Sequence, residues 1–304
     1  MKIKWVLSIF RLLKQILFKL QMKNLFILTF WMAFCLSSQG QQDALWLRYP
    51  SISPDGKTIV FSYQGDLYSV PSDGGMASPL TVHEAYDFMP VWSRDGKQIA
   101  FASERYGNFD VFVMPAAGGT AQRLTYHSAG EYPSDFTVDG KEVIYTSSQL
   151  DAVTNQQFPS GVLPELYRIP VSGGMPKQIL TTAAEAARYN NDGSVLVFHD
   201  RKGYEDEFRK HHRSSVTRDV WKYETRSGKY TRLTKFDGED RHPVFTPDQK
   251  QIYYLSEQSG SFNIWKMGAD GSNPVQVTSF KRHPVRNLSM SNDGTLCFSY
   301  DGML

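Results

Sequence analysis

Short stretches in which apolar and polar residues alternate recur along most of the chain, and this pattern predicts β-strands. In the first unit a strand-forming stretch ends at Ser53, the pair Asp55 and Gly56 follows, and alternating stretches cover residues 58–61 and 67–70. An Asp-Gly pair between two such stretches is a strong signal for the tight turn of an antiparallel hairpin. Residues 50–70 are therefore expected to form several short antiparallel strands.

The same turn recurs at intervals that indicate a repeat protein. Glycine follows the turn aspartate in every copy except at Gln249, and the successive spacings are 40, 44, 53, 56 and 45 residues. The further turn aspartates are Asp95, Asp139, Asp192, Asp248 and Asp293. The first five units also end in a strand that closes with threonine, at Thr81, Thr125, Thr181, Thr234 and Thr278. A strand-rich repeat of ~40–45 residues is typical of the blades of a β-propeller.

For residues 41–304 we therefore predict an all-β fold, a β-propeller of four-stranded antiparallel blades, six in number with the last blade truncated. An ordinary β-sandwich of evenly spaced strands is the alternative. Two insertions, at residues 147–164 and 203–221, interrupt the third and fourth blades. Long loops on a repeat scaffold are expected to project from its rim.

The sixth unit begins near Leu288 and stops at Leu304, before its third strand. A blade that lacks half of its strands leaves an open sheet edge beside its neighbour. We therefore expect apolar residues of the fifth blade, such as Ile264 and Trp265, to be incompletely covered. On this interpretation the chain is the front part of a longer protein.

Residues 1–40 are expected to be a leader that is absent from the mature protein. Residues 22–40 have a basic start, a short apolar stretch and small residues before Gln41, which is the pattern of a signal peptide. The apolar stretch of twelve residues is shorter than the ~20 residues that a spanning helix needs. We interpret residues 1–21 as a start-site artefact. The mature protein is then expected to be exported, periplasmic or secreted, with no stable membrane span.

Composition removes two further possibilities. The formal net charge is +2, but residues 1–40 hold six lysines and arginines and no acid, so residues 41–304 have a net charge of −4. A mildly acidic domain lacks the basic surface that nucleic-acid binding requires. The two cysteines are Cys35, in the leader, and Cys297, so no intrachain disulfide is expected in the mature protein.

No motif for catalysis, metal binding or cofactor binding is found. The sequence lacks Gly-x-Ser-x-Gly, His-Glu-x-x-His, Cys-x-x-Cys and a glycine-rich phosphate loop. His211 and His212 lie near acidic residues, but adjacent side chains of an extended chain point in opposite directions. We predict no catalytic residue, no metal site and no cofactor in this chain.

Charged residues at the entrance of the innermost strands are the candidate binding residues. The inner-strand ends of a propeller surround its central channel. Ion pairs between blades are the alternative explanation for these charges. The candidates are Arg48, Asp87, Glu131, Glu185, Arg241 and Arg286.

The Ser-Pro-Asp-Gly turn with its downstream Leu-Thr resembles the repeats of the Tol-system periplasmic propeller and of tricorn-type proteases. Residues 203–224, GYEDEFRKHHRSSVTRDVWKYE, followed by RLTKFDGEDRHPVFTPD, are similar more specifically to the exported tricorn-like serine peptidases of bacteria. This resemblance implies an N-terminal propeller followed by a second propeller, a PDZ-like domain and a serine peptidase domain that acts on oligopeptides.

The catalytic serine and histidine of that family have no counterpart in this chain. The resemblance thus implies a propeller that gates or channels peptides and supports assembly, with oligopeptides, the missing C-terminal domains and a possible homo-oligomer as partners. Two alternatives remain, namely a non-enzymatic Tol-type binding propeller and the propeller of a prolyl-oligopeptidase-like hydrolase. The Tol type normally has a small α/β domain before its blades. The sequence beyond Leu304 would distinguish the tricorn-like, Tol-type and prolyl-oligopeptidase-like propellers.

Overall fold

The computed structural model describes residues 17–19, 23, 45–149, 163–204 and 213–304. The chain divides into two units, Met1–Ala44 and Leu45–Leu304, and the second unit is the one described below. All of the predicted signal peptide except Lys23, much of the insertion after Ser147, and the pair His211 and His212 lie outside the described residues. No helix within the described part of the chain is long and apolar enough to cross a membrane.

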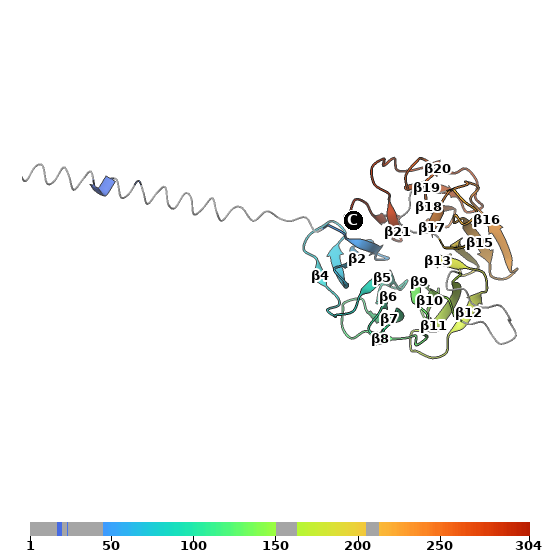
Figure 1. The fold of residues 1–304 in the computed structure, drawn as a ribbon, viewed down its shortest axis with the longest axis horizontal. Coiled ribbons are helices and arrows are strands. Elements are labelled where there is room, and N and C mark those ends of the chain that lie inside the picture. The colour runs from blue at the N-terminus through green and yellow to red at the C-terminus, as the bar shows by residue number, and fades with distance from the viewer. Residues whose placement is uncertain (1–16, 20–22, 24–44, 150–162, 205–212) are drawn as a thin grey trace, which may run out of the picture. The chain divides into compact units, whose positions relative to one another are not determined.

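Residues 45–304 form consecutive antiparallel sheets arranged around a common centre (Figure 1). The first blade consists of β1 (Arg48–Ile52), β2 (Thr58–Tyr63), β3 (Asp66–Pro71) and β4 (Ser78–Pro79). The second consists of β5 (Asp87–Trp92), β6 (Gln98–Ser103), β7 (Asp110–Pro115) and β8 (Gln122–Arg123). The third consists of β9 (Glu131–Phe136), β10 (Glu142–Ser147), β11 (Glu165–Pro170) and β12 (Lys177–Leu180).

The fourth blade consists of β13 (Ala184–Tyr189), β14 (Val195–Asp200), β15 (Val220–Glu224) and β16 (Lys229–Arg232). The fifth consists of β17 (Asp240–Phe245), β18 (Gln251–Ser256), β19 (Asn263–Gly268) and β20 (Val275–Gln276). A sixth sheet has two strands, β21 (Arg286–Met290) and β22 (Leu296–Ser299). The predicted all-β propeller of four-stranded antiparallel blades is confirmed for five blades, and the blade number of a complete ring stays a prediction.

The repeated Asp-Gly turn is held by the same side-chain hydrogen bonds in five of the six copies, whereas in the fourth Asp192 accepts the hydroxyl and backbone N–H of Ser194. Ser53 Oγ donates to Asp55 Oδ1 at 2.6 Å, and Asp55 Oδ1 accepts the backbone N–H of Lys57 at 3.2 Å. The residue after the aspartate has a left-handed backbone, with φ of 74° at Gly56, which glycine adopts without strain. Gln249, the exception, has φ of 61° and its side-chain amide donates to Thr246 O at 2.8 Å.

The closing threonine joins the third and fourth strands of a blade. Thr81 Oγ1 accepts the backbone N–H of Leu67 at 2.9 Å and donates to Asp66 Oδ1 at 3.2 Å. Equivalent backbone N–H bonds end on Thr125, Thr234 and Thr278. Thr181 differs because it is exposed and lies beyond a register shift between β11 and β12.

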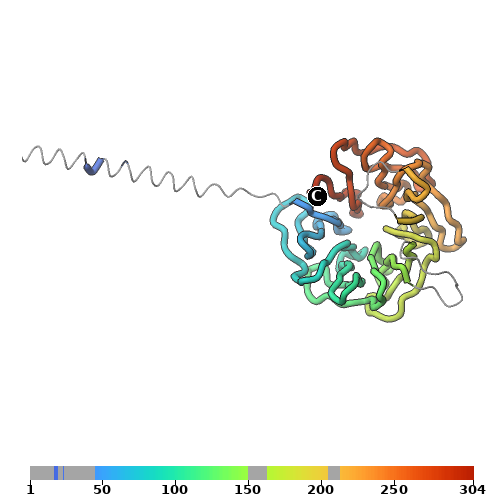
Figure 2. Tube along the Cα trace, in the orientation of Figure 1, coloured from blue at the N-terminus to red at the C-terminus, as the bar shows by residue number. Residues whose placement is uncertain are grey.

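One backbone hydrogen bond recurs at each of the six junctions between neighbouring sheets. At the first junction the N–H of Asp87 donates to Gly65 O at 2.7 Å, and at the last the N–H of Leu47 donates to Gly302 O at 2.9 Å. Ser289 Oγ adds a contact across that last junction by accepting the N–H of Ile52 at 3.2 Å. The first and last strands thus lie side by side and complete a ring of inner strands (Figure 2).

The expectation that the fifth blade is incompletely covered was wrong for Ile264. Its side chain is completely buried, because Leu288, Phe298 and Tyr300 belong to the same packed cluster. Two strands of the sixth sheet are therefore sufficient to cover this face. Trp265 is half-buried and packs toward the fourth blade.

We predict that Thr81→Val lowers the free energy of unfolding by about 1–3 kcal/mol, because the buried N–H of Leu67 loses its acceptor. Thr181→Val, at the closing threonine of the third blade, is the matched control. Because Thr181 is exposed, we expect its substitution to change the free energy of unfolding by less than about 0.5 kcal/mol. Urea denaturation of the full chain measures both values. Equal losses in the two variants would contradict the role assigned to Thr81.

Candidate binding site in the central channel

A β-bulge interrupts the pairing of each inner strand where it faces the channel. The first bulged residue has a left-handed backbone in five of the six strands, at Tyr49, Met89, Ala186, His242 and Asn287. Proline follows at Pro50, Pro90 and Pro243. Proline is compatible with this position because the bulged residue donates no hydrogen bond to the sheet.

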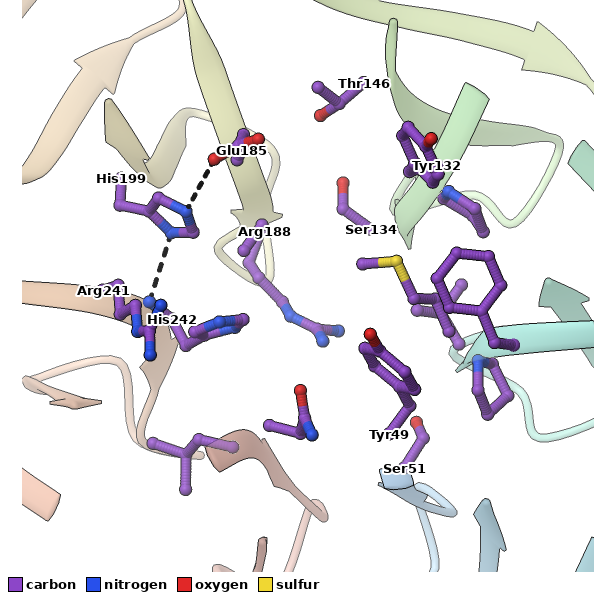
Figure 3. A pocket seen from close by; sticks show the side chains of 18 of the residues that line it. Tyr49, Ser51, Tyr132, Ser134, Thr146, Glu185, Arg188, His199, Arg241 and His242 are labelled. Atoms are coloured by element: carbon purple, nitrogen blue, oxygen red, sulfur yellow. Dashed lines mark hydrogen bonds and ion pairs between the residues drawn. The ribbon is translucent and has the colours of Figure 1, made fainter. Parts of the chain in front are cut away.

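The bulges of the inner strands surround a cavity of about 460 Å³ (Figure 3). Ligand pockets are commonly ~300–1,000 Å³, so this space is large enough for a small ligand or part of a peptide. Blades one to three supply an aromatic wall that contains Tyr49, Phe88 and Tyr132. The ring centroids of Tyr49 and Phe88 are 5.2 Å apart, and those of Phe88 and Tyr132 are 6.0 Å apart.

Blades four and five supply a charged wall built around Glu185. Its carboxylate lies 2.8 Å from Nη1 of Arg201 and 3.3 Å from Nε of Arg218. Arg218 also pairs with Glu239 at 2.6 Å. Burial raises the pKa of Glu185, but the hydrogen bond from His199 and the nearby arginines outweigh it and hold the pKa well below its ordinary value. Glu185 is therefore an ionised acceptor at neutral pH.

Two histidines complete this wall. The backbone N–H of His242 donates to Nδ1 of His199 at 3.2 Å. Nε2 of His199 therefore holds the ring proton and faces Glu185 Oε2 at 3.3 Å (Figure 3). Burial lowers the pKa of His242 well below its ordinary value, and the charges of Arg241 and Arg218 act in the same direction. His242 is thus a neutral group at the channel wall.

The structure brings two of the six candidate residues into this cavity, Glu185 and Arg241. Arg48 is exposed and lines a second cavity of about 590 Å³ with Trp46 and Tyr86, and Arg286 is half-buried and lines neither cavity. Asp87 and Glu131 are completely buried.

A register difference explains why Asp87 and Glu131 do not line the cavity. They occupy the first residue of their inner strands, whereas Glu185 and Arg241 occupy the second residue of theirs. Successive side chains of a strand point to opposite faces, so a shift of one residue moves a side chain away from the channel. Asp87 instead pairs within its own blade with Arg105 at 2.6 Å.

Glu131 lies between the second and third blades, where its Oε1 accepts a hydrogen bond from Gln149 at 2.7 Å. Burial, with a contribution from the charge of Asp110, raises its pKa to about 7. Asp240 takes the equivalent place between the fourth and fifth blades, and burial, with the charges of Asp219 and Glu239, also raises its pKa to about 7. These carboxyl groups belong to blade junctions.

Sequence reasoning missed Arg188, which extends from β13 into the cavity (Figure 3). The other inner strands have Ser51, Val91, Asp135, Val244 and Ser289 at the equivalent place, counted from the turn. An arginine in the middle of one inner strand was therefore a signal in the sequence. Among the described residues, no group of three or more histidine, cysteine or acidic side chains is placed to hold a metal ion.

Antiparallel blades around a channel with one aromatic and one charged wall define a β-propeller with a ligand-sized channel cavity. The family model for the tricorn protease N-terminal beta propeller domain matches residues 44–304, and the chain belongs to this family.

Known proteins share this fold at low sequence identity. The tricorn protease structure has 22% identity and a TM-score of 0.70, covering 85% of this chain and 25% of that one. TolB from Acinetobacter baumannii has 20% identity and a TM-score of 0.60, covering 80% of this chain and 56% of that one. An uncharacterized protein of Agrobacterium fabrum is 27% identical over 142 residues, which are 45% of this chain and 43% of the relative. The chain thus matches less than half the length of this curated relative.

We predict that Glu131→Gln reduces the pH dependence of stability. Between pH 4.5 and about 7 the folded protein keeps the proton of Glu131 while the unfolded chain has lost it. The free energy of unfolding therefore falls as pH rises through this window, by about 3 kcal/mol for this group, and the variant lacks that decrease.

Urea denaturation at pH 5 and pH 8 measures this difference. Exposed Glu84 provides the control, since Glu84→Gln is expected to retain the slope of the original protein. An unchanged slope in Glu131→Gln would show that this carboxyl group does not carry the effect.

Proposed function

We propose that this chain is the N-terminal propeller of an exported tricorn-like serine peptidase and that it binds oligopeptides in its channel. The observation that supports this proposal most strongly is the cavity at the bulges of the inner strands, with its aromatic and charged walls. Aromatic faces accept apolar side chains, and the charged groups opposite them offer donors and acceptors for a peptide backbone. The proposed role is to guide peptides and to support assembly with further domains of the same polypeptide.

The family match and the likeness to peptidase-associated propellers support this assignment over the other classes. We further propose that the ring has six blades, with the sheet of β21 and β22 as the sixth. Export is proposed from the signal-peptide pattern of residues 22–40. A non-enzymatic TolB-like binding propeller shares the fold and is the alternative to this proposal.

Peptide binding in the channel is testable by filling the cavity. We predict that the full chain binds fluorescein-labelled oligopeptides and that Ala186→Trp, which places a large ring in the cavity, weakens this binding at least about 10-fold. Val275→Trp is the matched control, because Val275 is exposed on the outer strand β20. Fluorescence anisotropy measures the affinities, and thermal melts establish that both variants fold.

Binding that survives Ala186→Trp would place the peptide elsewhere on the molecule. Absence of any oligopeptide binding by the unmodified chain would contradict the proposed function.

We predict that the full chain binds peptides without cleaving them. The sequence offers no activated nucleophile, and binding alone does not supply one. Mass spectrometry of a peptide mixture after prolonged incubation is expected to show only the intact peptides. Turnover that persists through purification and is lost on substitution of His211 or His212 would overturn this prediction.

A further inference from the structure

Arg188 differs from the other arginines of the channel because its guanidinium makes no hydrogen bond or ion pair with the residues that the structure describes. Arg201 and Arg218 are paired with Glu185, and Arg218 is also paired with Glu239. The guanidinium of Arg241 lies over the ring of Phe262 at 4.2 Å. The contacts of the other three arginines are thus provided by the protein itself.

The neighbourhood of Arg188 does not neutralise it fully. The carboxylate whose charge raises the pKa of Arg188, that of Asp135, is shared, since its Oδ2 accepts from Arg94 at 3.3 Å and from the backbone N–H of Tyr189 at 3.0 Å. Of the guanidinium groups that line the cavity, those of Arg201 and Arg218 pair with Glu185, and Arg218 also pairs with Glu239. Asp135 has its own ion pair with Arg94 and is therefore not a dedicated counter-ion of Arg188.

Partial burial makes the unpaired charge of Arg188 costly. Arg188 is half-buried in the middle of β13, and burial lowers its pKa while Asp135 raises it. An arginine nevertheless stays protonated in proteins, so the guanidinium keeps its charge. A partly desolvated guanidinium with free donors is the group that binds a planar anion such as a carboxylate through two parallel hydrogen bonds.

Arg188 points across the cavity toward Tyr49 of the aromatic wall (Figure 3). We propose that the channel recognises a peptide carboxylate that lies next to an apolar side chain, with Arg188 binding the carboxylate and the wall of Tyr49, Phe88 and Tyr132 receiving the apolar group. This inference rests on the proposed peptide-binding function and specifies the chemical class of the peptide. The carboxylate is either the free C-terminus or an acidic side chain.

Three labelled peptides of one sequence test this proposal on the full chain. The first ends in Phe with a free carboxylate, the second is its C-terminal amide, and the third is the amide with Glu before the Phe. The free acid or the Glu peptide is expected to bind about 10-fold to 100-fold more tightly than the plain amide, the range for a charge-assisted pair of hydrogen bonds. Which of the two binds more tightly identifies the source of the carboxylate.

Substitutions then assign the effect to Arg188. Arg188→Gln is expected to abolish the preference for the carboxylate peptides over the plain amide while leaving the affinity for the plain amide unchanged. Arg188→Lys is expected to retain part of that preference. Arg168→Gln, which alters an arginine paired with Glu142 in the third blade, is the matched control and is expected to keep the full preference.

A thermal melt separates ligand recognition from a structural role. Because Arg188→Gln removes a charge that lacks a hydrogen-bond partner, we expect the variant to melt at the same temperature as the original protein or higher. If Arg188 were instead a structural counter-ion of Asp135, the variant would melt at a lower temperature. A lower melting temperature, or equal affinity for all three peptides, overturns the inference and leaves peptide binding intact. If none of the three peptides binds, the proposed function itself fails.

Discussion

Each sheet is joined to its neighbour by a backbone hydrogen bond from the beginning of an inner strand to a carbonyl in the segment that follows the second strand of the sheet before it. The bond is made six times with nearly the same length, from 2.7 to 3.0 Å. Because it uses only backbone groups, it constrains the position of the inner strand without constraining the side chains that the strand carries. The side chains of the inner strands can therefore differ from blade to blade while the blades are joined in the same way.

The parts of the fold that depend on local chemistry were predictable from the sequence. The Asp-Gly turn is stabilised by a hydroxyl two residues before the aspartate, and the closing threonine bonds to a backbone N–H that is fourteen residues away. Both interactions need particular side chains at fixed spacings, so they leave a visible repeat. Coverage of Ile264 was not predictable, because it depends on how a partial sheet packs against its neighbour.

The candidate site was predictable only in part, for a geometric reason. A charged residue at the entrance of an inner strand lines the channel or lies between blades according to its position, and Glu131 and Glu185 differ in this by a single residue. The bulge then alters the direction of the residues that follow it. His199 and Arg218 are further from prediction, since they come from the second strand and the loop before the third, and only folding brings them to Glu185.

The bulges of the inner strands have a consequence for how such a protein changes over evolutionary time. At a bulge the residue is released from the ladder, so its side chain can be exchanged without a change of register in the sheet. Tyrosine, methionine, alanine, histidine and asparagine already occupy the equivalent left-handed position in five blades of this one chain. Each blade can therefore acquire a new channel residue by a single mutation while the other blades retain theirs, so the lining of the channel can evolve one position at a time.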